Sequence, residues 1–266
     1  MMEPIELLEV DALNTLCGWQ RGTGNWAGVK AAIARQDPIQ VIQEAGSTRW
    51  QSLLPSDHCF YFGFPDYTAT TRETTPEPKA RIWISPIQRR FAPESALPKV
   101  QWHPRVLWVG VGCQRGTSES LIEYAIQKTL RSHHFAEAAI AGIATIDRKV
   151  NEAGLVRFCG DRNLPLQLFS AEALSAVTVP NPSVAVEMGT FSVAEAAAIL
   201  ATLPYTADSA IQSSLRIEKK IIRVEGQPGS VTVAIAQADR EYTDDPTLIE
   251  DVLSILNHDP QAFGIF

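Results

Sequence analysis

The chain has 266 residues, of which 45% are hydrophobic and 20% charged, so we expect an ordinary globular protein with two domains and a core in each. Its formal net charge of -7 and its pI near 5.3 argue against nucleic acid as a main partner, because phosphate binding needs a basic surface. No stretch is apolar enough to cross a membrane, the N-terminus does not resemble a signal peptide and the four cysteines are widely spaced, so we expect a cytoplasmic protein with reduced thiols and no bound metal.

The first part of the chain, residues 1–98, is expected to form a smaller N-terminal α/β domain. A helix is predicted around Trp26–Gln36, and the apolar run Ile39–Ile42 predicts a strand. Glu44 comes just after that strand, where a carboxylate can act as a base, although a lone acidic residue is more often structural. The segment 64–98 is rich in Pro, Thr and charge, which indicates a loop and linker.

Other side chains of this domain have a structural interpretation. Trp19, Trp26 and Trp50 are expected to pack in the core or between domains, although a flat macrocycle would also stack well on one of them. The basic run Gln88–Arg90, near the linker, is typical of a solvated face.

Residues 99–240 show the alternation of strands and helices that is typical of an α/β domain. The predicted elements are a strand at Arg105–Val111, a helix from Ser118 to about His133, strands at Ala141–Ile146 and Leu164–Phe169, a helix at Ser192–Leu203, and a hairpin of Lys220–Glu225 with Val231–Ala238. Ser118 and Ser192 are expected to cap their helices, and Glu195 to complete a capping box with Ser192. The pattern predicts an α/β fold with a mixed sheet flanked by helices, followed by a helical C-terminal extension at 241–266.

The most informative motif is the glycine-rich turn Gly110–Ser118, between a predicted strand and a predicted helix. Such a turn exposes backbone N–H groups beside the positive end of the helix dipole, and therefore suits a phosphate or a carboxylate. Arg115 can add charge, and Thr117 and Ser118 can add hydroxyls. The alternative is a tight turn with ordinary capping. The glycine spacing, with Asp147 as a ribose ligand, also fits a dinucleotide site weakly, whereas a P-loop is excluded because no Gly-Lys-Ser/Thr follows.

Two further loops place polar groups near strand ends. Asp147, followed by Arg148 and Lys149, closes the second strand of this domain, where an ionised carboxylate can orient water, and a solvated helix start is the alternative. The segment Glu187–Ser192 leads into the next helix and offers hydroxyls and amides that can meet a ligand opposite Arg115.

Six motifs in the same order resemble the CbiG (cobalt-precorrin 5A hydrolase) family in its C-terminal domain, and the related single-domain protein CobE. They are Gly110–Ser118, Ala144–Lys149, Phe169–Glu172, Val179–Ser183, Gly189–Ala197 and Val231–Ala236. The resemblance extends from about Arg105 to Ala238, and residues 8–54 are similar, more loosely, to the middle segment of the family.

The resemblance implies a role in cobalamin biosynthesis, namely hydrolysis of the δ-lactone of cobalt-precorrin 5A with loss of acetaldehyde. That reaction needs a base for water, donors for the developing oxyanion and anchors for many peripheral carboxylates. The candidate bases are Asp147, Glu44 and Glu187. The candidate substrate-binding residues are Gly112, Cys113, Arg115, Gly116, Thr117, Ser118, Lys149, Gly189, Thr190 and Ser192.

The expected partner is a cobalt-precorrin tetrapyrrole, which carries its own cobalt, so no cofactor and no metal ligand of the protein are expected. Full-length members of the family carry a further N-terminal domain ahead of the middle segment, and we expect this chain to begin after it. Three alternatives follow: the domain is dispensable, another polypeptide or cobalamin-biosynthesis enzyme supplies it, or this protein binds the intermediate and hands it on without reaction. Contact with nucleic acid or a membrane is not expected.

Overall fold

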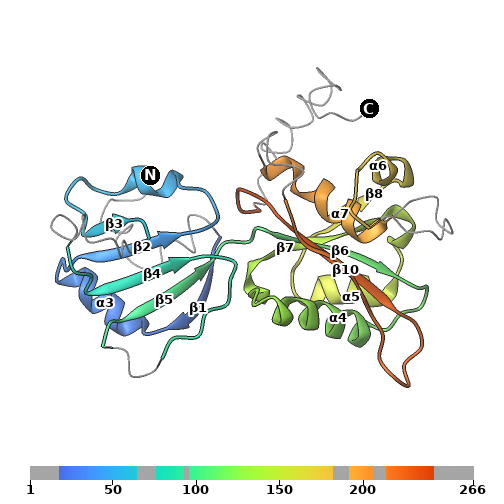
Figure 1. The fold of residues 1–266 in the computed structure, drawn as a ribbon, viewed down its shortest axis with the longest axis horizontal. Helices are drawn as coiled ribbons and strands as arrows, with labels where there is room; N and C mark the ends of the chain where they lie inside the picture. Colours follow the sequence, from blue (N-terminus) through green and yellow to red (C-terminus); the bar gives the residue numbers. More distant parts are fainter. Residues whose placement is uncertain (1–17, 65–75, 93–95, 182–191, 207–213, 243–266) are drawn as a thin grey trace, which may run out of the picture. The chain divides into compact units, whose positions relative to one another are not determined.

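The structure, a computed structural model, describes residues 18–64, 76–92, 96–181, 192–206 and 214–242. These residues form two compact units (Figure 1). The first unit extends to Arg105 and includes His134–Ala139, whereas the second contains Val106–His133 and the chain from Ile140 onward.

The first unit is built on a five-stranded sheet with the order β1-β5-β4-β2-β3. The strands are β1 (Gln20–Gly24), β2 (Ile39–Gln43), β3 (Phe60–Phe62), β4 (Ala80–Ile84) and β5 (Lys99–His103), and the helical segments are α3 (Trp26–Ala34) and the short 3₁₀ helices η1 (Arg49–Leu53) and η2 (Glu137–Ala139). β2 pairs in parallel with both β3 and β4, β4 pairs in parallel with β5, and β1 is antiparallel to β5. The predicted helix and first strand of this region are confirmed by α3 and β2.

The first unit extends beyond the boundary predicted at residue 98. The reason is β5, which completes the sheet of this unit between β4 and β1. Trp19, Trp50 and Trp102 are buried in its core, and Trp26 packs edge-on against Trp102 with ring centroids 5.1 Å apart. Trp19, Trp26 and Trp50 therefore pack in the core of this unit, which agrees with the structural interpretation of these residues.

The second unit is a mixed α/β sheet flanked by helices, as predicted, with the order β8-β7-β6-β10-β9. The strands are β6 (Leu107–Cys113), β7 (Ile140–Ile146), β8 (Leu166–Phe169), β9 (Leu215–Ile222) and β10 (Val231–Gln237). The helices are α4 (Glu119–Ser132), α5 (Ala153–Asp161), α6 (Ala171–Ser175) and α7 (Val193–Thr202), with 3₁₀ helices η3 (Asp147–Lys149) and η4 (Leu203–Tyr205). β6, β7 and β8 are parallel, whereas β10 is antiparallel to β6 and forms the predicted hairpin with β9.

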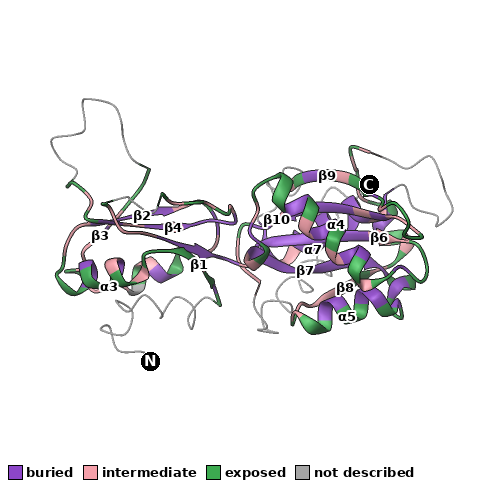
Figure 2. Ribbon diagram, turned by 90° about the horizontal axis from the view of Figure 1, so that it is seen from below, coloured by how far each residue is buried: buried purple, intermediate pink, exposed green. Residues whose placement is uncertain are grey.

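Helices cover both faces of the second sheet, with α4 and α5 on one face and α7 on the other (Figures 1 and 2). The approach of α7 to β6 is especially close, because a Cβ added to Gly110 would lie 1.8 Å from the carbonyl oxygen of Ala194. Only a glycine allows the backbone of the helix to lie directly on the strand at this point. The first glycine of the predicted anion motif is thus explained by packing.

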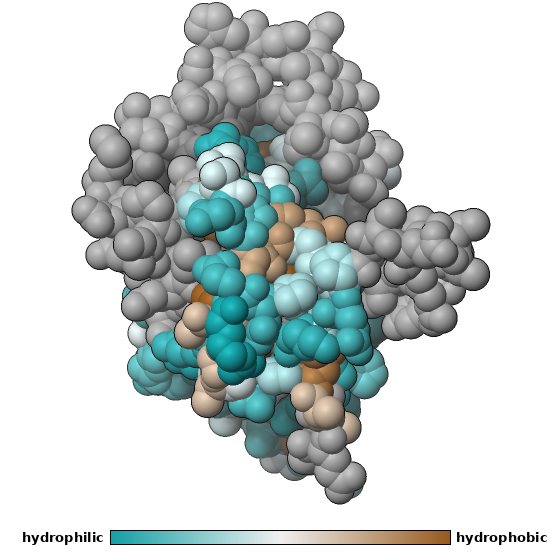
Figure 3. All heavy atoms as spheres, turned by 90° about the vertical axis from the view of Figure 1, so that its left-hand side faces the viewer, coloured by the Kyte–Doolittle hydropathy of each residue, from teal (hydrophilic) through white to brown (hydrophobic). Residues whose placement is uncertain are grey.

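One face of the described residues is drawn in Figure 3. The face drawn in Figure 3 is mostly hydrophilic, with small hydrophobic patches between polar side chains. Within the described ranges, no helix combines the length and the hydrophobicity that a membrane crossing requires. The predicted helical extension falls almost entirely on residues 243–266, which lie outside the described part of the chain.

Candidate functional site

The loop between β6 and α4 has the backbone shape that the glycine motif predicts. Ser118 caps α4, with its hydroxyl accepting a hydrogen bond from the N–H of Leu121 at 3.2 Å. The Thr117 hydroxyl donates to the carbonyl oxygen of Gln114 at 2.8 Å and thereby closes the turn. Gly116 has a φ of 77°, in the left-handed region where a glycine is favoured. The loop is therefore a fixed turn at the carboxyl end of a parallel strand, where α/β proteins commonly bind ligands.

A carboxylate of the protein itself is bound to this loop. Oε1 of Glu152 accepts a hydrogen bond from the backbone N–H of Gly116 at 2.7 Å, and Oε2 accepts one from Nζ of Lys149 at 3.0 Å. The side chain of Lys149 is only 9% exposed, and that of Glu152 only 8%. The N–H group of this turn thus binds the carboxylate of Glu152, whereas the sequence predicted an anionic ligand there.

The chain following β7 brings these groups together. β7 ends at Ile146, and the 3₁₀ turn of η3 carries Lys149 and then Glu152 toward the loop. At the start of α5, a Cβ on Gly154 would lie 2.3 Å from the carbonyl oxygen of Thr117, so the helix begins almost in contact with the loop backbone. This close approach places Glu152 within reach of Gly116.

Electrostatics keep Glu152 ionised. Burial by itself would raise the pKa of this carboxyl, but the hydrogen bonds from Lys149 and Gly116 and the charges of Lys149 and Arg115 together lower it below its usual value. The pKa of Cys113, at the end of β6, is shifted in the opposite direction, above its usual value. Burial raises the pKa of its thiol, Lys149 lowers it and Glu152 raises it, so the net effect is a thiol that stays protonated near neutral pH.

Part of the predicted substrate-binding set therefore converges on one place: Gly116 and Lys149 bind the Glu152 carboxylate, and Cys113 lies near Lys149 and Glu152 and interacts with the Thr117 hydroxyl. Arg115 and Asp147 border this region and are both exposed. Gly112 has a different role, because its carbonyl accepts the Thr232 hydroxyl at 3.0 Å and a Cβ there would come within 2.3 Å of the Thr232 Oγ1.

The entrance of α7 forms a second polar cluster, and it corrects one prediction. Ser192 precedes the helix but makes no side-chain cap, so the predicted capping box is absent. Its hydroxyl instead donates to Oε2 of Glu195 at 2.9 Å. Oε1 of the fully buried Glu195 accepts from Nδ2 of Asn181 and from the N–H of Lys219, both at 3.0 Å. Glu195 therefore joins three segments of the unit, and both of its carboxylate oxygens are occupied by these donors.

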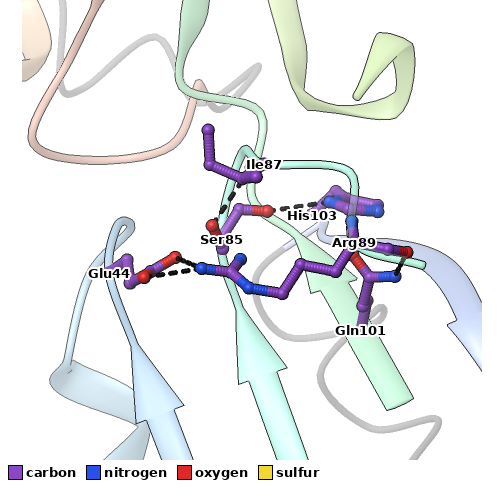
Figure 4. A network of polar contacts seen from close by, with 6 residues as sticks. All are labelled: Glu44, Ser85, Ile87, Arg89, Gln101 and His103. Carbon is purple, nitrogen blue, oxygen red and sulfur yellow. Dashed lines mark hydrogen bonds and ion pairs between the residues drawn. The ribbon is translucent and has the colours of Figure 1, made fainter. Parts of the chain in front are cut away.

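The remaining predicted residues lie elsewhere. Glu44 belongs to the first unit, where both its oxygens accept hydrogen bonds from Nη2 of Arg89 at 2.7 Å (Figure 4). Arg89 was expected on a solvated face, yet its side chain is only 23% exposed. Glu187, Gly189 and Thr190 fall outside the described residues.

Glu152 is the functional candidate that sequence reasoning missed. Its signal was weak: a carboxylate three positions after Lys149, in the turn that follows a strand. In addition, no three His, Cys, Asp or Glu side chains of the described ranges lie close enough together to hold a metal ion.

Fold and site together define a two-unit α/β protein that presents a carboxylate-binding turn at the carboxyl ends of parallel strands. Residues 9–104 match the family model described as the cobalamin biosynthesis central region, and residues 107–236 match the model described as the cobalamin synthesis G C-terminus. The chain therefore belongs to the CbiG family, and with it to cobalamin biosynthesis.

Two curated relatives carry the name cobalt-precorrin-5A hydrolase. The protein of Priestia megaterium is 27% identical over 233 residues, which is 86% of this chain and 58% of the relative. That of Salmonella typhimurium is 25% identical over 168 residues, which is 62% of this chain and 46% of the relative. The chain thus spans about half the length of the curated relatives it matches.

Solved structures of the same pathway are also similar. CobE is 26% identical, with a TM-score of 0.39, and the match covers 51% of this chain and 93% of CobE. A cobalamin biosynthesis protein G homologue from Sulfolobus solfataricus is 15% identical, with a TM-score of 0.38, and the match covers 86% of this chain and 60% of the homologue.

Proposed function

We propose that this chain takes part in the hydrolysis of the δ-lactone of cobalt-precorrin 5A, in which the two-carbon unit leaves as acetaldehyde. In this proposal water attacks the acyl carbon of the lactone and the acyl–oxygen bond breaks, which gives a carboxylate and an alcohol that still carries the two-carbon unit. Loss of the proton from that hydroxyl then breaks the carbon–carbon bond to the macrocycle, which keeps the electron pair and takes up a proton, and acetaldehyde leaves. The curated relatives named for this activity support the reaction class.

One observation carries the assignment to a site: the turn at Gly116, with Lys149, holds the carboxylate of Glu152. An N–H donor and an ammonium that bind an internal carboxylate can equally bind a carboxylate arm of the tetrapyrrole or the oxyanion of the lactone. We propose that the substrate takes over one or both of these donors, and that exposed Arg115 adds charge at the rim.

Among the predicted bases, Asp147 fits the reaction better than the other described candidate. It directly follows β7, is exposed to water and lies two residues before Lys149. Glu44 has both oxygens engaged by Arg89, and the lowered pKa of Glu152 makes that carboxylate a weak proton acceptor. We therefore assign the removal of a proton from water to Asp147.

The test is anaerobic incubation of the full chain with cobalt-precorrin 5A, alone and together with the N-terminal part of a longer relative, with acetaldehyde measured by a coupled NADH assay. Lys149→Gln and Asp147→Asn should each lower the rate by at least about 100-fold, the lower end of what one base or one charged donor contributes. Lys79→Gln is the matched control, because Lys79 pairs with Glu77 on the surface of the first unit. Absence of acetaldehyde at every protein concentration, with and without the added part, would refute hydrolysis.

A second candidate function is favoured by the same geometry. A turn whose donors hold an ionised carboxylate is also what a protein needs to bind a corrinoid intermediate and deliver it to another cobalamin-biosynthesis enzyme without reacting it. Tight binding of cobalt-precorrin 5A that depends on Lys149, with no turnover under any of the conditions above, would support this channelling role.

A further inference from the structure

The sheet of the first unit has a topological switch point between β2 and β4. These strands are parallel neighbours, but the chain leaves β2 toward β3 on one side and leaves β4 toward β5 on the other. In open α/β sheets, ligands bind in the crevice at the carboxyl ends of the two strands that flank such a point. Glu44 follows β2 there, and the segment from Ser85 to Arg89 follows β4.

Arg89 is held in one conformation at this point (Figure 4). Its guanidinium lies over the ring of Trp83 at 4.0 Å from the centroid. Its backbone is held by Gln101, whose Oε1 accepts the Arg89 N–H at 2.8 Å and whose Nε2 donates to the Arg89 carbonyl at 2.6 Å. Nη2 then donates to both oxygens of Glu44. The cation is therefore fixed before any ligand arrives, which lowers the entropy cost of binding.

One donor of Arg89 is left over. Considering only the residues that the structure describes, Nη1 has no hydrogen-bond partner, although the atom is buried. A charged donor removed from water without a partner is costly, and such atoms call for an explanation. The Nδ1 atom of neighbouring His103 is hydrogen-bonded to the carbonyl oxygen of Ser85 at 2.8 Å. Burial lowers the pKa of this imidazole ring, so the ring stays neutral. The positive charge of this network is thus concentrated on Arg89.

We propose that Arg89 is a second carboxylate-binding site of the protein, in which Glu44 is an internal stand-in that a carboxylate arm of the ligand joins or displaces. The ligand class, an acidic tetrapyrrole, rests on the proposed function, whereas the chemistry of the site does not. Glu44 is suited to displacement, because its side chain is 24% exposed and can return to water at little cost.

The two partners of the pair give opposite predictions. With uroporphyrin III as the probe and the full chain as the receptor, Glu44→Gln should tighten binding about three- to fivefold, because a competing negative charge is removed. Arg89→Ala and Arg89→Lys should weaken it on the order of tenfold, because the planar donor pair is lost. Glu77→Gln, at an ion pair elsewhere in the same unit, should leave the affinity unchanged.

The place where the probe binds is determined by NMR from the indole N–H resonance of Trp83, which is assigned with the variant Trp83→Phe. The probe should shift this resonance in the wild type and in Lys149→Gln, but not in Arg89→Lys, whose folding is checked by its melting temperature. A weaker complex in Glu44→Gln, or an unshifted Trp83 resonance, would mean that a water molecule satisfies Nη1 and that the ion pair is structural. A failure to release acetaldehyde would refute hydrolysis but would not change these binding and NMR results, so the hydrolysis proposal and the Arg89 site can be refuted independently.

Discussion

The two units apply the same chemistry at different depths. Each places a cation and a carboxylate at the carboxyl ends of parallel strands, Arg89 with Glu44 in the first unit and Lys149 with Glu152 in the second. The first pair has side chains 23% and 24% exposed, and the second 9% and 8%. Burial sets the cost of exchange that we propose for each pair: the shallow pair can release its carboxylate to water, whereas in the deep pair a carboxylate or oxyanion of the ligand must replace Glu152 at its donors.

The largest expected effect is on stability when the deep pair is broken. Lys149→Met leaves Glu152 buried, with the Gly116 N–H as its one remaining donor among the residues that the structure describes, and should destabilise the second unit by about 3–5 kcal/mol in urea unfolding. Arg89→Met should cost about 0–1 kcal/mol, because its pair is partly solvated. The double variant Lys149→Met/Glu152→Leu should recover most of the loss. Equal losses in the two units would show that depth does not distinguish the pairs.

The next effect tests the close contact that positions Glu152. Gly154→Ala would place a methyl group 2.3 Å from the Thr117 carbonyl oxygen, and should destabilise by about 1–3 kcal/mol through overpacking. Gly160→Ala, in the same helix, meets nothing within 4 Å and should stabilise the helix by up to about 1 kcal/mol. If both variants unfold at the same urea concentration, the contact between loop and helix is not restrictive.

The units should also differ in their response to acid. The pKa of His103 is lowered in the folded state, so the unfolded chain binds more protons, and the first unit should begin to lose stability as the pH falls below the ordinary histidine pKa of about 6.5. His103→Gln should flatten this part of the profile. The pKa of Glu152 is lowered from 4.5, so its contribution should persist above that pH and disappear as the pH falls through its folded value. Unfolding free energies measured from pH 7 to pH 4 check the order, and a profile unchanged by His103→Gln would contradict it.

The smallest effect concerns a thiol. Glu152 raises the pKa of Cys113 and Lys149 lowers it, so Glu152→Gln should increase the thiolate fraction and the rate of alkylation by iodoacetamide. Cys159, whose pKa burial raises to about 12, serves as the internal control and should stay unreactive in both proteins. Peptide mass mapping separates the two sites. A rate at Cys113 that does not change would place Glu152 too far from the thiol.

Much of the fold followed from local pattern. Continuous apolar runs predicted the buried strands β2, β6 and β7, and the periodicity after Ser118 predicted α4 together with its cap. The domain boundary was misplaced, because nothing local in β5 tells with which sheet it pairs. The pairing of β5 depends on β1 and β4, which are distant from it in the sequence.

The shape of the loop after β6 was predictable from the sequence, whereas the partner of its N–H group was not. The glycine turn indicated that an N–H would bind an anion, but the partner of Gly116 lies 36 residues away in the sequence. Similarly, the spacing of Ser192 and Glu195 suits a capping box. The capping box does not form because Asn181 and Lys219 donate hydrogen bonds to the buried carboxylate instead, and only the tertiary structure brings these donors to it. Arg89 was predicted to be a solvated surface charge, because its partners, Trp83 on β4 and Glu44 after β2, cannot be identified from the sequence around it.

The buried carboxylate of Glu195 has a consequence for protein engineering. Asn181 and Ser192, which stand at the two ends of the stretch 182–191, both donate a hydrogen bond to this one side chain. The residues on both sides of this stretch are therefore held by one carboxylate, which also accepts the N–H of Lys219 in β9 and so ties them to the sheet. We therefore expect that an exchange of this stretch between relatives requires Asn181, Ser192 and Glu195 to be retained.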